Sequence, residues 1–138
     1  MTLSLTVPLV GDSIPGRDEW QQEIDKLSLD VRLDPELDLA RDSGFSPTTI
    51  LGRKSGFEIY MVESREPATD WPSIAGSLSG PTRAVCFCWR GDMIECACVL
   101  AAAAGLVQRW GKAAVDDDGM AYDGPSLLNE FHACVSEL

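Results

Sequence analysis

The segment Ala84-Val85-Cys86-Phe87-Cys88-Trp89, followed by a two-residue break and a long alanine-rich stretch, decides which fold this sequence can adopt. Its six residues are apolar on both alternating faces, which is typical of a strand covered on both sides. Asp92, with Glu95 three positions later, has the spacing of a capping box and indicates the start of a helix. Because Glu95 is the only charged residue over 93–107, we expect a central buried helix over about residues 92–110.

Shorter patterns before and after this predicted strand and helix indicate the remaining elements. Alternating apolar and polar residues predict strands, and apolar residues at helical spacing predict amphipathic helices. The strands are expected at 2–10, 29–33, 48–51, 57–62, 113–115 and 120–122, and the helices at 17–27 and 126–138. Turns are expected at 44–47, 52–56 and 116–119, a left-handed helix cap at Gly111, and a long connection at 64–82. The sequence therefore predicts one α+β domain over residues 1–138, with a mixed or antiparallel sheet packed on the central helix and a C-terminal amphipathic helix.

The strongest global feature is a net charge of −11, and its distribution along the 138 residues is uneven. Acidic residues dominate 1–42 and 92–138, whereas acids and bases nearly balance over 43–91. Direct binding to nucleic acid is not expected, because it depends on Lys and Arg displacing the counterions of the phosphate backbone. The natural complement of such a chain is a basic protein, although net charge also serves solubility.

Three features of the sequence bear on its cellular location. The N-terminal residues lack the basic start and long apolar core of a secretion signal. The longest apolar run, 96–107, is shorter than the roughly 20 residues that cross a bilayer. Five cysteines in such a chain indicate reduced thiols, and the odd number argues against a disulfide framework. We therefore expect a cytoplasmic protein without membrane contact.

Two cysteine pairs, Cys86 with Cys88 and Cys96 with Cys98, invite a zinc interpretation, since four thiolates can bind zinc tetrahedrally. Residues two apart on a helix point about 200° apart, so Cys96 and Cys98 are poorly placed to share one ion. Buried structural thiols are the simpler interpretation. Thiol catalysis would require a base beside the cysteine, and the one histidine, His132, lies on the last predicted helix.

Two groups of acids are candidate binding residues. The first surrounds the predicted hairpin and consists of Asp116, Asp117, Asp118 and Asp123. Its oxygens could hold a divalent cation, but the spacing lacks the closing glutamate of a calcium loop, so an acidic tip that faces a basic partner is favoured. The second group consists of Asp30, Asp34, Glu36 and Asp38. Trp71, in the proline-rich connection, is the tryptophan expected to be exposed and is therefore the candidate apolar anchor of an interface.

Two passages of the chain resemble a known class of protein. They are Gly44-Phe45-Ser46-Pro47 through Gly52-Arg53-Lys54-Ser55-Gly56-Phe57-Glu58, and Trp89-Arg90-Gly91-Asp92 with the alanine-rich helix, Gly111 and the Asp-rich hairpin. Together they resemble small bacterial proteins of the immunity type, which are encoded beside secreted antibacterial toxins. The resemblance implies a protein that neutralises a toxin by binding it, and it carries no catalytic motif.

The leading hypothesis is therefore a non-catalytic immunity protein without a cofactor. It would occlude a cognate toxin, such as a basic nuclease, through an acidic surface, as a monomer or a homodimer. The alternative is a small cytosolic enzyme or metal-binding protein that uses Cys86, Cys88 and His132 with the aspartates. A third hypothesis is a scaffold that self-associates through the apolar helix.

Overall fold

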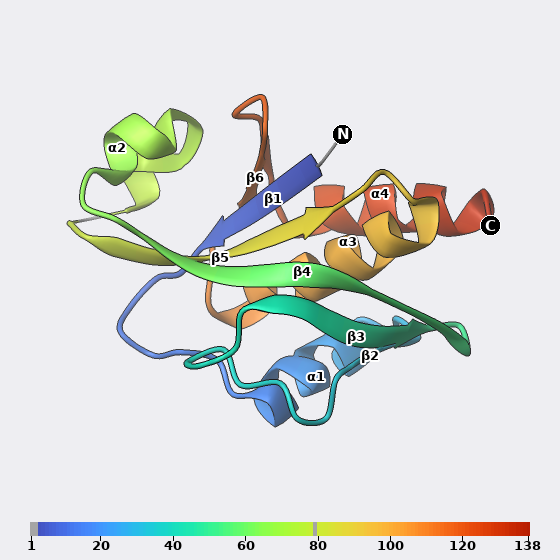
Figure 1. The fold of residues 1–138 in the computed structure, drawn as a ribbon. Helices are drawn as coiled ribbons and strands as arrows, with labels where there is room; N and C mark the ends of the chain where they lie inside the picture. Colours follow the sequence, from blue (N-terminus) through green and yellow to red (C-terminus); the bar gives the residue numbers. More distant parts are fainter. Residues whose placement is uncertain (1–2, 79) are drawn as a thin grey trace.

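A computed structural model describes residues 3–78 and 80–138 of the chain, and Figure 1 shows an α+β fold built on one sheet. Within these residues seven strands pair antiparallel throughout, in the order β2-β3-β4-β5-β1-β6-β7. The strands are β1 (Leu3–Pro8), β2 (Val31–Leu33), β3 (Gly44–Ile50), β4 (Arg53–Ser64), β5 (Thr82–Trp89), β6 (Ala114–Asp116) and β7 (Ala121–Tyr122). The predicted fold class is confirmed, and the sheet is antiparallel. Thr2, the first residue of the predicted N-terminal strand, lies outside the described residues.

Three helices cover one face of this sheet, and a short helical connection covers one end of the other face (Figure 1). The first three are α1 (Arg17–Lys26), α3 (Met93–Arg109) and α4 (Gly124–Ser136); the connection contains α2 (Pro67–Asp70) and the 3-10 helix η1 (Pro72–Ser77). The predicted central and C-terminal helices are therefore confirmed. None of the helices over 3–78 and 80–138 is long and apolar enough to cross a membrane.

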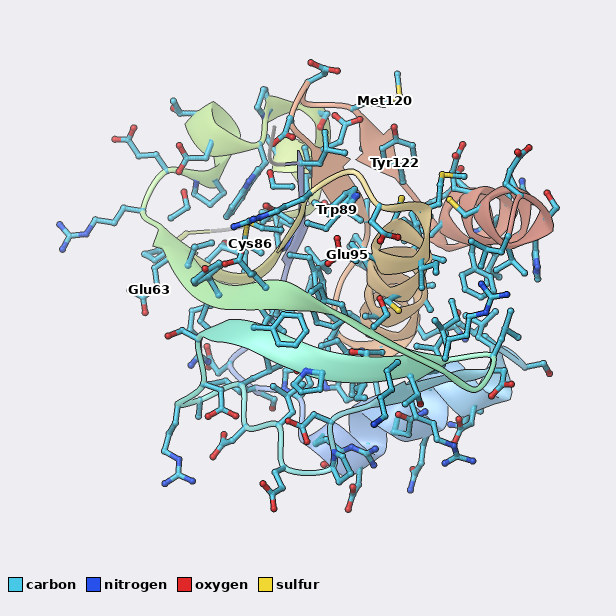
Figure 2. The ribbon with its side chains drawn as sticks, turned by 45° about the vertical axis from the view of Figure 1, so that its right-hand side comes forward. Glu63, Cys86, Trp89, Glu95, Met120 and Tyr122 are labelled. Atoms are coloured by element: carbon cyan, nitrogen blue, oxygen red, sulfur yellow. The ribbon has the colours of Figure 1, made fainter. Side chains whose placement is uncertain are left out.

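The segment that decided the fold forms the centre of the sheet and the helix behind it. Phe87 of β5 is fully buried and lies between Leu5 of β1 and Ile59 of β4. Cys86 and Cys88, on the opposite face, are only half-buried, so β5 is not covered on both sides along its whole length. Figure 2 labels Cys86 and Trp89 on this strand. The apolar pattern therefore predicted the central strand correctly, whereas the expected cover on both sides is incomplete.

The helix α3 is surrounded because its small residues let other elements approach closely. Ala97 to Leu106 are all buried, and α1 and α4 pack against the helix on different sides. The indole Nε1 of Trp20, on α1, donates to the carbonyl oxygen of Ala102 at 2.9 Å. A Cβ at Gly105 would lie 2.7 Å from Cγ1 of Ile24, so only glycine fits under α1 there. The start of α3 agrees with the predicted cap, since the Asp92 carboxylate accepts from Ile94 N at 2.7 Å.

The predicted left-handed cap at Gly111 is wrong. The helix α3 ends at Arg109, its C-cap Trp110 has a φ of −117° and a ψ of −8°, and Gly111 is not among the positive-φ residues. A Cβ at Gly111 would lie 2.8 Å from Cγ1 of Val7 and 3.1 Å from the carbonyl oxygen of Pro8. Glycine is therefore required here by the close approach of β1 rather than by its backbone dihedrals.

The turn between β3 and β4 also differs from the prediction. Residues 44–47 and 53–56, expected in turns, belong to the two strands, and the reversal consists of Leu51 and Gly52 alone. Their φ values of 49° and 78° are both positive, as in the type I′ turns that suit the twist of a hairpin. The sequence Leu-Gly does not predict this turn, because leucine rarely adopts positive φ.

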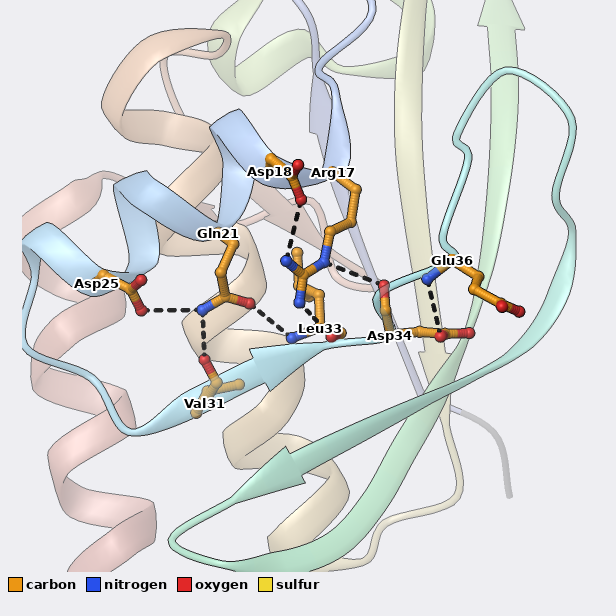
Figure 3. Close-up of polar contacts among 8 residues, drawn as sticks. All are labelled: Arg17, Asp18, Gln21, Asp25, Val31, Leu33, Asp34 and Glu36. Atoms are coloured by element: carbon orange, nitrogen blue, oxygen red, sulfur yellow. Dashed lines mark hydrogen bonds and ion pairs between the residues drawn. The ribbon is translucent and has the colours of Figure 1, made fainter.

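Side chains of α1 secure the edge strand β2 (Figure 3). Gln21 accepts from Leu33 N at 2.7 Å through Oε1 and donates to the carbonyl oxygen of Val31 at 2.9 Å through Nε2. Arg17 Nη2 donates to the carbonyl oxygen of Leu33 at 2.7 Å. These bonds occupy backbone groups that an edge strand would otherwise expose to another chain.

Candidate partner-binding site

The hairpin between β6 and β7 carries the first group of predicted acids, and Asp116 holds its turn together. One oxygen of the Asp116 carboxylate accepts from Asp118 N at 2.9 Å and Met120 N at 3.0 Å. The other oxygen accepts from the hydroxyl of Tyr122 at 2.8 Å. Gly119 supplies the positive φ of 83° that the reversal requires. The carboxylate of Asp116 therefore fixes the conformation of the hairpin that presents its neighbours.

These hydrogen bonds shift the pKa values of both Asp116 and Tyr122. Partial burial raises the pKa of Asp116, but the hydrogen bonds from Tyr122 and from the backbone of the turn outweigh it and hold this pKa below its ordinary value. The hydrogen bond to Asp116 is in turn the main reason that the pKa of Tyr122 is raised to about 12. The hairpin thus carries a stable negative charge at neutral pH.

Two further acids of the hairpin group attach it to other elements. Asp117 accepts from Ser4 N at 3.0 Å and also from the Ser4 hydroxyl, which fastens the tip to β1. Asp123 caps α4 by accepting from Ser126 N at 2.9 Å, and that bond lowers the pKa of its carboxyl. Asp118 is exposed, and its carboxylate takes part in no hydrogen bond or ion pair among the described residues.

A pocket of about 250 Å³ opens between this hairpin, β1, α3 and α4. We call it the hairpin pocket. Its apolar and thiol walls are Leu3, Leu5, Trp89, Cys96, Leu100, Tyr122 and Cys134, and its polar lining is Ser4, Asp116, Asp117, Asp118 and Glu130. Leu5, Trp89 and Leu100 are buried, whereas Asp117, Asp118 and Glu130 are exposed, so the pocket has an apolar floor and an acidic rim. Figure 2 shows Tyr122 on the hairpin and Trp89 at the end of β5.

Two thiols in and near the hairpin pocket, those of Cys96 and Cys88, are poor nucleophiles. Burial, together with the Cys134 thiol and the Glu130 carboxylate, raises the pKa of Cys96 to about 12. Burial and the neighbouring Cys86 thiol, 4.0 Å away between the sulfur atoms, raise the pKa of Cys88 to about 12. Because the thiolate is the reactive form, neither group is prepared for catalysis.

The four cysteines of the zinc interpretation, which the sequence did not favour, do not converge on one point in the described residues. The Cys96 sulfur lies 3.8 Å from that of Cys134, whereas Cys98 is fully buried in the core. The helix therefore directs the two thiols toward different neighbours, as its geometry requires. No group of three or more metal-ligating side chains is arranged around a common point in the part of the chain that the structure describes.

The second predicted acidic group lies at the opposite edge of the sheet. Asp30 and Asp34 flank β2, which four strands separate from β6. Asp34 accepts from Glu36 N at 3.1 Å (Figure 3), and Asp38 accepts from Ala40 N at 3.0 Å and pairs with Arg41. These carboxylates stabilise local turns, and they do not form one surface with the hairpin.

The predicted exposure of Trp71 is wrong. Its side chain is 9% exposed and packs against Ala84 and Val115 on the sheet face opposite α3. Pro67 and Pro72 each begin a helical turn, which folds this connection back onto the sheet. The tryptophan is therefore covered by the fold.

Sequence reasoning missed the walls of the hairpin pocket. Leu3 and Cys134 are separated by almost the whole chain, and they meet because β1 pairs with β6 while α4 packs on α3. Glu130 lies in the predicted C-terminal helix, and nothing in the sequence showed that it faces the hairpin.

Comparisons of the chain with protein-family models, with curated proteins and with solved structures find no match. Its function therefore has to be argued from its own residues.

Proposed function

We propose that this chain is a non-catalytic immunity protein, which binds a cognate antibacterial toxin and occludes its active site through the β6–β7 hairpin. The observation that carries this proposal is the fixed acidic rim above an apolar pocket. Asp116 and Asp117 are held by hydrogen bonds within the fold, so little conformational entropy is lost when a partner binds. Such an arrangement suits a binding surface better than a reaction centre.

The charge of the chain defines the kind of partner. A net charge of −11 and an acidic edge attract a basic protein and raise the rate of encounter. A toxin that cuts nucleic acid needs a basic active-site surface, because its substrate is a polyanion. The proposed partner is therefore a basic toxin such as a nuclease, and the proposed setting is the bacterial cytoplasm, with the chain as a monomer or a homodimer.

The test is a binding and inhibition measurement with the product of the neighbouring reading frame. The tagged chain is used to capture that product at low and moderate salt, and the activity of the captured toxin is assayed. One tight, salt-sensitive complex without toxin activity is expected. A toxin that stays fully active in the presence of excess chain would contradict the proposal.

A charge reversal at the hairpin locates the interface. Asp118→Lys with Glu130→Lys changes two exposed carboxylates that hold no described hydrogen bond, so the fold is expected to survive. We expect weaker toxin binding and a flatter dependence on salt. The matched control is Asp12→Lys with Glu66→Lys, which makes the same charge change at exposed positions outside the hairpin pocket. An equal loss in both double variants would mean that only net charge matters.

A further inference from the structure

We infer that the hairpin pocket is a socket for one arginine side chain of the partner protein. This inference rests on the proposed function and adds to it the chemistry of the contact. In the complex, the aliphatic part of the arginine would lie on the apolar floor, and its guanidinium group would meet the acidic rim.

The size of the pocket fits one side chain. A volume of about 250 Å³ lies below the range of roughly 300–1,000 Å³ that is usual for drug-sized ligands. It equals the space of about eight water molecules at roughly 30 Å³ each. Because Leu5, Trp89 and Leu100 form the floor, releasing that water to admit a hydrocarbon chain is favourable.

The charge of the rim selects a cation. Asp116, Asp117, Asp118 and Glu130 line the pocket, and no Lys or Arg lines it among the described residues. None of the ion pairs found in the described part of the chain involves these four carboxylates. Asp116, Asp118 and Glu130 all raise the pKa of Tyr122 by their charge, which is consistent with a negative potential inside the pocket.

Arginine fits this combination better than lysine or a metal ion does. Its guanidinium group is planar and weakly hydrated, stacks on aromatic rings such as that of Tyr122, and binds carboxylates through two hydrogen bonds. Lysine carries a strongly hydrated point charge, which loses more hydration beside an apolar floor. A divalent metal ion would need several oxygen ligands around one point, and the described residues provide no such group.

The floor residue Trp89 also carries a buried donor without a partner in the described part of the chain. Trp89 is 9% exposed, and its Nε1–H has no hydrogen-bond partner among the described residues. A buried donor without a partner costs free energy. Because Trp89 lines the hairpin pocket, its Nε1–H signal reports on what enters the pocket.

The first test uses small probes and the whole chain. N-acetyl-arginine amide is titrated into ¹⁵N-labelled protein and compared with N-acetyl-citrulline amide, which has nearly the same shape without the charge, and with N-acetyl-lysine amide. We expect the arginine probe to shift the signals of Trp89 Nε1–H and of the Tyr122 and Cys96 amides, and to bind about fivefold or more tightly than either other probe. Equal shifts from the citrulline or lysine probe, or no shift at these residues, would overturn the inference.

Two pairs of substitutions distinguish the effect of the rim carboxylates on arginine binding from the effect of net charge. Asp118→Asn with Glu130→Gln should weaken the arginine probe about fivefold, since each carboxylate contributes a modest ion contact. The control, Asp12→Asn with Glu66→Gln, makes the same charge change at exposed positions outside the pocket and should leave binding unchanged. Equal weakening by both pairs would show that the pocket contributes nothing specific.

The two proposals fail in different ways. If the toxin is bound and inhibited but its affinity is unaffected by Asp118→Asn with Glu130→Gln, the immunity function stands and the arginine socket is wrong. If the arginine probe binds as expected but the toxin remains active, the socket stands and the immunity function is wrong.

Discussion

Asp117 accepts a hydrogen bond from the backbone nitrogen of Ser4 at 3.0 Å, across a separation of 113 residues, and a second one from the Ser4 hydroxyl. The tip of the β6–β7 hairpin is thereby fastened to the first strand. This contact joins two walls of the hairpin pocket, so the shape of the pocket depends on it.

Replacing Asp117 should loosen the hairpin. Asp117→Ala removes the acceptor of both bonds, and we expect the free energy of unfolding to fall by about 1 kcal/mol. The amides of Ser4 and Asp118 should exchange with solvent faster in the variant. Asp118→Ala is the matched control, because its carboxylate takes part in no described hydrogen bond, and it should change stability by less than about 0.5 kcal/mol. Equal effects would show that the Ser4 contact does not matter.

The contact between Asp116 and Tyr122 should make stability depend on pH. The pKa of Asp116 is lower in the folded chain than its ordinary value of about 3.9, so its contribution is present above that value and is lost as the pH falls through the folded pKa. Tyr122→Phe removes the hydroxyl that donates to Asp116. We therefore expect this variant to be less stable than the wild type at pH 7, and the difference to shrink below about pH 4. Urea unfolding of both proteins at pH 7 and below about pH 4 measures this difference in the free energy of unfolding. A difference that does not change with pH would contradict the role assigned to the Asp116–Tyr122 hydrogen bond.

The thiols with raised pKa should react slowly in the native protein. Burial raises the pKa of Cys88 and Cys96 to about 12, and that of Cys98 to about 11. At pH 7.5 we expect these three to be alkylated by iodoacetamide about tenfold or more slowly than in urea, where ordinary thiol pKa values apply. Peptide mapping by mass spectrometry assigns each rate. Fast native labelling of Cys88 would instead favour the hypothesis of a thiol enzyme.

The central strand and helix were predictable because local signals and burial agree there. The apolar residues of 84–89 favour a central position in a sheet, and Asp92 caps the helix through hydrogen bonds to residues that follow it directly. The turn at Leu51 and Gly52 was not predictable in the same way, because the pairing of β3 with β4 imposes a backbone conformation that leucine does not favour.

The candidate site was predictable only in part. The hairpin and its acids follow from Asp118-Gly119 and the clustered charge, but the roles of the acids do not. Whether an aspartate is free, caps a helix or bonds to a distant strand depends on what the fold places beside it, as Asp123 and Asp117 show. Trp71 was misjudged for the same reason, since a proline-rich sequence does not reveal which sheet face it folds onto.

Two glycines should be required by packing. Gly105→Ala would place a Cβ 2.7 Å from Cγ1 of Ile24, and Gly111→Ala one 2.8 Å from Cγ1 of Val7. Overpacking of this kind costs about 1–3 kcal/mol, which is at least as large as the roughly 1 kcal/mol that alanine contributes through helix propensity at Gly105. Thermal unfolding should show lower midpoints for both variants. Gly76→Ala, where a Cβ meets nothing within 4 Å, is the control and should leave the midpoint nearly unchanged.

Gln21, together with Arg17, should be a residue on α1 that the edge strand depends on. It is 5% exposed, and Gln21→Leu would leave Leu33 N and the carbonyl oxygen of Val31 without their side-chain partner. A buried backbone group that loses its partner costs about 1–3 kcal/mol, so the free energy of unfolding in urea should fall by that amount. Gln22→Leu is the matched control, because Gln22 is the exposed neighbour on the same helix. If amide exchange at Leu33 is faster in Gln21→Leu alone, the loss of stability arises from β2. If both variants lose the same free energy of unfolding, the loss arises from the helix α1.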